Sequence, residues 1–201
     1  MNARISREFT LDAGIHYEGR FLINSYVMEL FMDVTTEDVR EQNIALERVK
    51  YLLTEALDSC VFVDYQDVAA IDNYLKANMK VCPVPEGPYD QIIGSVLMSK
   101  FNAVTEGKLF VTEVKICSRI CDDLNFYVEY DEEMPLHTNI GTWWHENNTS
   151  ICDIKLKPNR KEKIVELKRE SKDWDDVGLT WKPKTKGKPK IVYIDPAIQT
   201  D

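Results

Sequence analysis

The chain has 201 residues, a hydrophobic share of 44%, a charged share of 29% and a formal net charge of −9. These values are typical of a soluble globular protein with one domain and an extension, and an acidic body argues against general nucleic-acid binding. No apolar run approaches the ~18 residues of a membrane helix, and no signal-like segment opens the chain, so we expect a cytoplasmic protein without membrane contact.

The charge is divided unevenly along the chain. Residues 155–190 carry 13 Lys or Arg and 6 Asp or Glu, a balance of +7, whereas the remainder has a balance of −16. Such a basic segment can dock an anionic partner, and we expect no nucleic-acid binding outside it. We divide the chain into a domain over residues 1–133 and a C-terminal extension over residues 134–201, which includes the basic, Pro-containing stretch 182–190.

The first half of the chain predicts two strands and then helices. Apolar and polar residues alternate over residues 3–12, and residues 20–33 form a longer run rich in aromatic and β-branched residues. Residues 35–38 can cap a helix, whose apolar residues recur at three- and four-residue spacing up to Leu57. Residues 60–63 are expected to form an edge strand, and residues 67–76 a short helix.

The second half predicts a helix and a closing hairpin. Pro88 is expected as the first residue of a helix whose apolar face extends to Phe101. Residues 109–117 and 124–130 are expected as paired strands, and residues 191–194 as a terminal strand. The order ββ, helices, ββ predicts an α+β fold, with an antiparallel four-stranded sheet, helices on one face and a C-terminal extension.

Several segments within residues 4–130 follow the motif order of one family. They are Glu8-Phe9-Thr10-Leu11-Asp12-Ala13, Tyr26-Val27-Met28-Glu29-Leu30, Leu57-Asp58, Pro88-Tyr89-Asp90-Gln91 and Val114-Lys115-Ile116-Cys117-Ser118. In this order they resemble the 6-pyruvoyl- and 6-carboxy-tetrahydropterin synthase family, which has a tunnelling fold. The resemblance implies a ββααββ unit that joins further copies edge to edge as a homo-oligomer.

The resemblance also implies a zinc ion held by three histidines, and these positions are replaced. The first falls on Ile15, or on His16 if one residue is inserted, and the others fall on Leu22 and Asn24. Leucine cannot ligate a metal, and one imidazole does not hold zinc at useful affinity. We therefore predict no metal site and no cofactor, with His16 as the only remnant of the ligand set.

The other positions that the resemblance assigns to chemistry are replaced as well. The acid–base histidine falls on Ser59, the Glu of the helix-start motif on Gln91, and the pterin-anchoring Glu on Ser118. A hydroxyl can form one neutral bond where a carboxylate forms two charge-assisted ones. We predict no catalytic residue, and we take Ser118, Gln91 and Asn24 as candidate ligand-binding residues.

Four further groups could bind a metal, a cation or a ring but are more simply explained as packing or surface residues. They are Cys117 with Cys121, His137 with His145, the acidic runs 122–123 and 131–133, and Trp143 with Trp144. Small hydrophobic cysteines in a sheet, surface imidazoles, solvated acidic turns and core tryptophans account for them without a ligand.

Three functions remain open from the sequence. The first is a non-catalytic relative of the synthases that binds a purine- or pterin-like heterocycle or a protein partner, as a binding or scaffold protein. The second is an active pteridine-converting lyase of a folate, biopterin or queuosine pathway, with a site that the motifs do not reveal. The third is an acidic interaction module that docks through its basic tail. No cysteine stands before Cys60, although the resemblance implies a cysteine nucleophile or general base near the histidine positions. The joint loss of histidine, cysteine and glutamate at the matched positions favours the first function, so the sequence leans against an enzyme.

Overall fold

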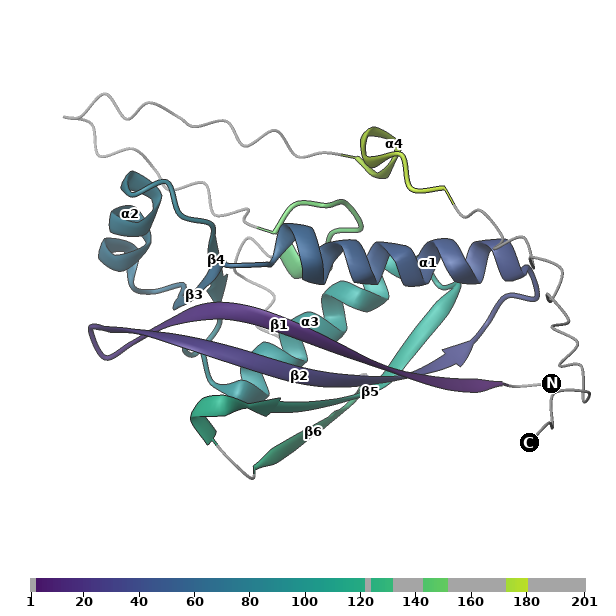
Figure 1. Ribbon diagram of the computed structural model, residues 1–201, viewed down its shortest axis with the longest axis horizontal. Helices are drawn as coiled ribbons and strands as arrows, with labels where there is room; N and C mark the ends of the chain where they lie inside the picture. The colour runs from purple at the N-terminus through teal and green to yellow at the C-terminus, as the bar shows by residue number, and fades with distance from the viewer. Residues whose placement is uncertain (1–2, 122–123, 132–142, 152–172, 181–201) are drawn as a thin grey trace, which may run out of the picture.

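The computed structural model describes residues 3–121, 124–131, 143–151 and 173–180 (Figure 1). Its strands are β1 (Arg4–Tyr17), β2 (Arg20–Val34), β3 (Val61–Asp64), β4 (Val81–Val84), β5 (Leu109–Ser118) and β6 (Asn125–Glu129). Its helices are α1 (Val39–Tyr51), α2 (Val68–Lys76), α3 (Asp90–Thr105) and α4 (Trp174–Val177), with the π-helical segment η1 (Leu52–Ala56) and the 3-10 turns η2 (Arg119–Cys121) and η3 (Trp143–His145).

One sheet organises the described residues, with the strand order β4-β3-β1-β2-β5-β6. The pairs β1–β2, β2–β5 and β5–β6 are antiparallel, whereas β3 pairs in parallel with both β1 and β4. The predicted α+β fold and its antiparallel ββ–helices–ββ core are therefore confirmed. The sheet has six strands instead of the expected four, because β3 and β4 add to the free side of β1.

The expectation that residues 60–63 form an edge strand is wrong. The strand β3 lies between β4 and β1, and β4 is the edge. The sequence of β4 contains Pro83, which indicates a turn when it is considered alone. Proline is tolerated in an edge strand, where its missing N–H removes no ladder hydrogen bond. The buried, all-apolar pattern of β4 thus forms a strand only because β3 is there to pair with it.

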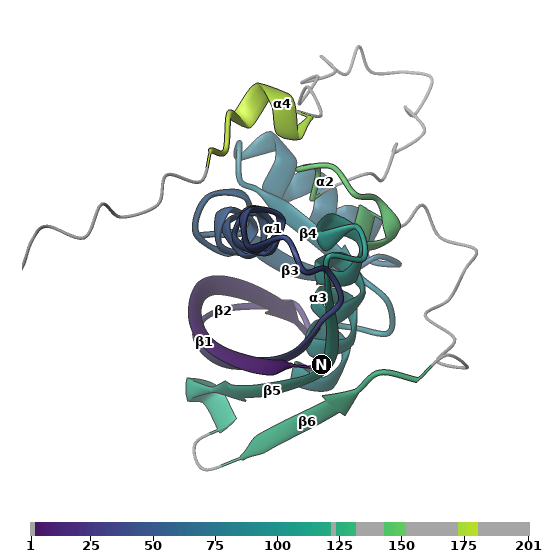
Figure 2. The same ribbon diagram turned by 90° about the vertical axis from the view of Figure 1, so that its right-hand side faces the viewer.

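The long helices cover one face of the sheet, which we call the inner face (Figures 1 and 2). Every second residue of β2 points to this face, so Tyr26, Met28 and Leu30 are fully buried. The helix α3 begins at Asp90, two residues after Pro88, because Tyr89 keeps an extended backbone as its N-cap. Gly94 lets α3 approach the sheet closely, since a Cβ there would lie 3.0 Å from a methyl of Val128.

The described part of the C-terminal extension packs into the same core. Trp143 and Trp144 are fully buried, which confirms the packing explanation for this pair. The indole N–H of Trp143 donates to the carbonyl of Pro83 at 2.9 Å. The buried Lys100 of α3 donates to the carbonyls of Trp143 at 3.0 Å and Glu146 at 2.8 Å. These bonds tie η3 to both α3 and β4.

Several predictions concern residues outside the described ranges. They are the acidic residues 122–123 and 132–133, His137, the basic stretch 182–190 and the terminal strand 191–194. In the described residues, no helix is long and apolar enough to cross a membrane.

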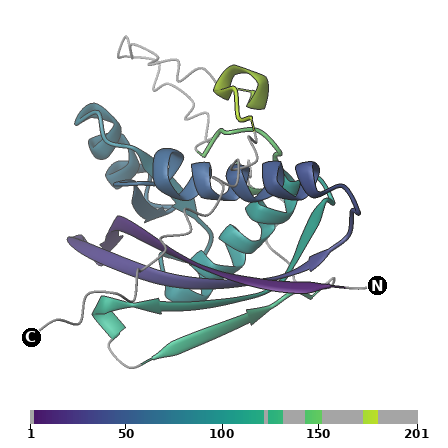
Figure 3. The same ribbon diagram turned by 45° about the vertical axis from the view of Figure 1, so that its right-hand side comes forward.

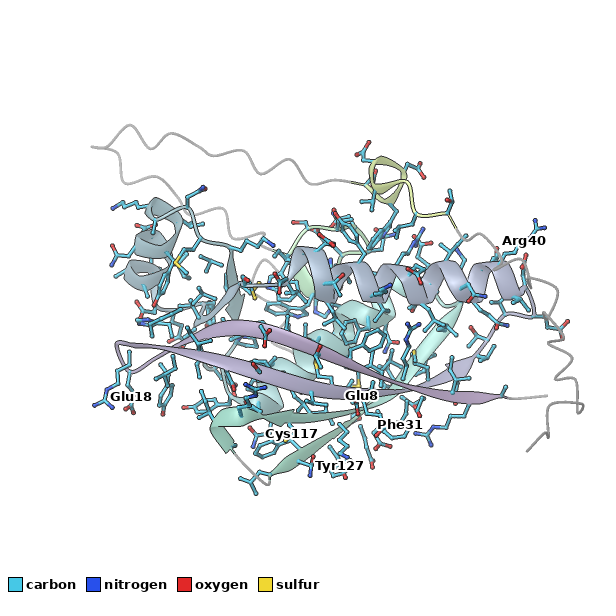
Figure 4. All side chains as sticks on the ribbon, viewed as in Figure 1. Glu8, Glu18, Phe31, Arg40, Cys117 and Tyr127 are labelled. Carbon is cyan, nitrogen blue, oxygen red and sulfur yellow. The ribbon has the colours of Figure 1, made fainter. Side chains whose placement is uncertain are left out.

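The other face of the sheet, which we call the outer face, is not covered by the described helices (Figures 2 and 3). Figure 4 shows Glu8, Phe31, Cys117 and Tyr127 on this side, pointing away from the helices. The face therefore mixes charged, aromatic and thiol side chains on one accessible surface.

Candidate functional site

Four polar side chains meet on the inner face, near the end of the sheet that carries the β1–β2 hairpin. Asn24 and Tyr26 lie on β2, Ser118 ends β5, and Asp90 begins α3. Tyr26 and Ser118 are direct partners across β2 and β5, and Asn24 shares their face because strand side chains alternate. Their relative exposures are 2% for Asn24, 0% for Tyr26, 9% for Asp90 and 2% for Ser118. We call these residues the polar cluster.

Each member of the polar cluster keeps one buried atom without a hydrogen-bond partner. These atoms are Asn24 Nδ2, Tyr26 OH, Asp90 Oδ2 and Ser118 Oγ. The amide of Asn24 is oriented by its other atom, since Oδ1 accepts from the backbone N–H of Ile120 at 3.3 Å. A buried polar group left without a partner costs about 1–3 kcal/mol. Four such groups in one place indicate that something beyond the chain, a ligand or water, completes them.

Burial also changes the pKa values in the cluster. It raises the pKa of the Asp90 carboxyl, and the nearby Ser118 hydroxyl offsets part of this rise without reaching hydrogen-bonding geometry. Burial likewise raises the pKa of Tyr26 above its usual value. The nearby Asn24 amide opposes this rise without reaching hydrogen-bonding geometry, and the charge of Asp90 adds to it. Tyr26 therefore stays a neutral hydroxyl. The cluster offers amide donors, two hydroxyls and a carboxyl group that takes up a proton more readily than usual.

Large side chains remain uncovered beside the polar cluster. Tyr17, Leu22, Tyr89 and Ile120 are each between 38% and 47% exposed. Tyr89 directly precedes α3, and Ile120 is bonded to Asn24. The rings of Tyr17 and Tyr89 meet edge to face with centroids 5.5 Å apart, and their hydroxyl oxygens lie 3.3 Å apart. The polar groups thus adjoin exposed flat rings, which can pack against a planar ligand.

The structure brings together two of the three predicted ligand-binding residues. Asn24 and Ser118 both belong to the polar cluster, whereas the side chain of Gln91 is exposed on α3 and lies outside it. Sequence reasoning missed Tyr26 and Asp90, because an aromatic in a strand and an acid at a helix start have ordinary structural explanations. The signal for Tyr26 was its two-residue spacing from Asn24, which places both on one face.

Both ring nitrogens of His16, the predicted remnant of the zinc-ligand set, contact other side chains. Its Nδ1 lies 2.8 Å from the hydroxyl of Tyr74, and its Nε2 lies 3.4 Å from a carboxylate oxygen of Asp67. Both partners belong to the start and body of α2, so His16 ties β1 to that helix. A zinc ion at His16 would have to displace one of these partners. Within the described ranges, no three or more His, Cys, Asp or Glu side chains gather to hold a metal, so the residues present do not fit the zinc ion that the resemblance implies.

The remaining residues singled out in the sequence contribute no side chain to the polar cluster. Ser59 has a left-handed backbone, with φ of 58°, and its hydroxyl donates to Asp58 at 3.2 Å. Cys117 and Cys121 are both free and half-buried, the first at the end of β5 and the second in η2. The turn between them ends the strand, so they do not share a regular strand face.

The described residues define an α+β protein with a buried, incompletely bonded polar site between a sheet and the start of a helix. No family model matches the chain, and no curated protein matches it. Solved structures do show a likeness in fold. An uncharacterized protein of Wolinella succinogenes, WS1659, is 10% identical with a TM-score of 0.48, over 65% of this chain and 99% of that one.

Two of the other structures are 6-pyruvoyl tetrahydropterin synthases. The one from Plasmodium vivax is 12% identical with a TM-score of 0.45, over 65% of this chain and 99% of that one. The one from Caenorhabditis elegans is 11% identical with a TM-score of 0.42, over 65% of this chain and 97% of that one. These likenesses agree with the resemblance predicted from the sequence. They concern the fold alone and carry no argument about chemistry.

Proposed function

We propose that this protein is a non-catalytic binding protein that holds a small, flat, polar heterocycle of purine or pterin type at the polar cluster. The observation that carries the proposal is the set of four buried side chains that each keep an unpartnered polar atom. A ring edge with both donors and acceptors would satisfy amide, hydroxyl and carboxyl groups together, whereas an apolar ligand would leave them unpaired. The exposed rings of Tyr17 and Tyr89 add flat surfaces beside the cluster.

We further propose that the protein binds this heterocycle without catalysing a zinc-dependent reaction. A catalytic zinc site needs three protein ligands and an open position. In this chain His16 has both ring nitrogens engaged by α2, and Leu22 and Asn24 supply no imidazole. Two results would overturn this part. One is stoichiometric zinc in the purified protein that is lost in His16→Ala, and the other is conversion of dihydroneopterin triphosphate by the full chain.

Calorimetric titration of the full chain with guanosine and with neopterin tests the binding itself. Ser118→Ala removes one unpartnered hydroxyl, and we expect it to weaken binding by at least about tenfold, the effect of about 1.4 kcal/mol. Ser95→Ala is the matched control, because its hydroxyl bonds the carbonyl of Gln91 at 2.8 Å on α3, away from the cluster. Equal affinities of the two variants would contradict the proposed site. Absence of binding by both probes would mean that water completes the cluster.

We also propose that the protein forms a homo-oligomer through the edge of β6. This strand ends the described sheet, and its Tyr127 is 60% exposed. An unpaired strand edge with apolar side chains favours pairing with another chain. Native mass spectrometry measures the assembly directly, and a monomer at micromolar concentration would contradict this part of the proposal.

A further inference from the structure

The outer face of the sheet carries a pocket. Its lining includes Tyr26 and Ser118 of the polar cluster, which are buried, together with outward-facing residues. Its volume is about 320 Å³, at the small end of the range for ligand sites. It lies over β1, β2 and β5, on the side where Figure 4 shows Cys117 and away from the helices. The outward-facing residues that line it are Thr10, Asp12, Ser25, Val27, Cys117 and Arg119.

The pocket carries one acid and one base. Asp12 pairs with Ser25 across β1 and β2. The β2–β5 ladder ends at the pair of Tyr26 and Ser118, and Arg119 follows as the first residue of η2. Because β2 lies between β1 and β5 in the sheet, the acid comes from one neighbour of β2 and the base follows the other.

A row of paired strand residues crosses the same pocket and carries no charged side chain. Thr10 pairs with Val27 across β1 and β2, and Val27 pairs with Cys117 across β2 and β5. Val27 is about half-exposed, so it provides an apolar floor at the centre of the pocket. The pocket thus combines one acid and one base with an apolar side chain at Val27.

The charged groups of the pocket are available to a ligand. The Ser25 hydroxyl donates to Oδ1 of Asp12, which orients the carboxylate and leaves its other oxygen for a further donor. Arg119 is exposed, and among the described residues none forms an ion pair with it. A guanidinium binds a carboxylate in a two-pronged, charge-assisted geometry.

We propose that this pocket, which we call the outer pocket, binds a small zwitterion, with an ammonium group at Asp12, a carboxylate at Arg119 and a short alkyl chain over Val27. A simple anion would be repelled by Asp12, and a simple cation by Arg119. A ligand that carries both charges satisfies both residues at once.

A titration followed by amide chemical shifts in NMR tests the outer pocket with the full chain. The probes are the ω-amino acids from glycine to 6-aminohexanoate, together with pentanoate and pentylamine, which each carry one charge of 5-aminopentanoate. We expect shifts at the pocket residues of β1, β2 and β5, and the dependence of affinity on chain length measures the separation of the two charges. Each single-charge probe should bind at least about tenfold more weakly than 5-aminopentanoate.

Two variants test which residue binds each charge of the ligand. Asp12→Asn should lower the affinity for 5-aminopentanoate to that for pentanoate, and Arg119→Gln should lower it to that for pentylamine. Glu29→Gln and Lys115→Gln are matched controls, because they neutralise one acid and one base on the same face outside the pocket. The dispersion of the amide spectrum reports whether each variant is folded.

Three outcomes would overturn the proposal. They are the absence of shifts at the pocket by any probe up to about 10 mM, equal binding of pentanoate and 5-aminopentanoate, and losses in Asp12→Asn and Arg119→Gln that do not exceed those of the controls.

Discussion

Replacing Tyr26 by phenylalanine should stabilise the free protein. The Tyr26 ring is fully buried and packs edge to face on Phe62, with centroids 6.3 Å apart, while its hydroxyl has no hydrogen-bond partner. Phenylalanine keeps the ring and its contacts, so the change creates no sizeable cavity. An unpaired buried hydroxyl costs about 1–3 kcal/mol, and we expect Tyr26→Phe to raise the free energy of unfolding by about 1 kcal/mol or more. For a chain of this size, that gain raises Tm by about 2–4 °C.

Urea unfolding followed by tryptophan fluorescence measures this change. Trp143, Trp144 and Trp174 are all buried in the core, so their emission reports its loss. The matched control is Tyr127→Phe, because Tyr127 is exposed on β6 and its substitution should change stability by less than about 0.5 kcal/mol. A bound heterocycle should stabilise the wild type more than Tyr26→Phe, since the variant lacks one of the groups that the ligand would complete.

The opposite sign would refute the reasoning. If Tyr26→Phe lost about 1 kcal/mol or more while Tyr127→Phe did not, the Tyr26 hydroxyl would have a partner in the free protein. The polar cluster would then be complete without a ligand, and the proposed site would lose the observation that carries it.

Three further predictions concern charge and packing. Burial raises the pKa of Asp90, so the folded state holds the carboxyl proton more tightly than the unfolded state does. The stability that this group contributes therefore falls as pH rises above the ordinary pKa of 3.8. Asp90→Asn should flatten that decline in urea unfolding, and an unchanged pH profile would contradict the burial effect. Burial alone would raise the pKa of Glu106, but the ion pairs with Arg48 at 2.9 Å and Lys108 at 3.3 Å together outweigh it and the pKa is lowered. This stabilisation is therefore present above 4.5 and is lost as pH falls through the lowered value. Glu106→Gln should remove that acid-side loss, which we expect to be about 1 kcal/mol or less because the pairs are partly solvated; an acid limb identical to the wild type would exclude the role of the pairs. Trp143→Ala should cost about 3–5 kcal/mol in calorimetric unfolding, because it empties a fully buried site and removes the bond to Pro83; a loss below about 1 kcal/mol would mean that the extension is not part of the core.

Much of the fold could be predicted from the sequence because it depends on local periodicity. Alternation in residues 3–12 and the apolar spacing from Ile44 to Leu57 correspond to β1 and to the helical run α1–η1. The strand β4 could not be predicted in this way, because a four-residue apolar stretch with Pro83 becomes a strand only when β3 pairs with it. Strand order is a property of pairs, and a single sequence reports mainly on single segments.

The polar cluster shows the same division. Asn24 and Ser118 were predicted as ligand-binding residues from their matched positions, and both lie in the cluster. Asp90 and Tyr26 were not, because an acid in the first turn of a helix and an aromatic in a strand are common in stable folds. Their significance depends on whether their polar atoms find partners, and that depends on the packing of α3 against β2 and β5.

The sequence by itself determined the α+β class, the main strands and helices, and the loss of histidine and glutamate at the positions of the resembled family. Side-chain alternation and residue identity carry this information, and they are local. Only the tertiary structure decided that Asn24, Tyr26, Asp90 and Ser118 form one buried group, and that Asp12 and Arg119 line one pocket on the opposite face. The physical reason is that strand pairing and helix docking, which join residues up to about a hundred positions apart, set which polar atoms lose water and which remain exposed.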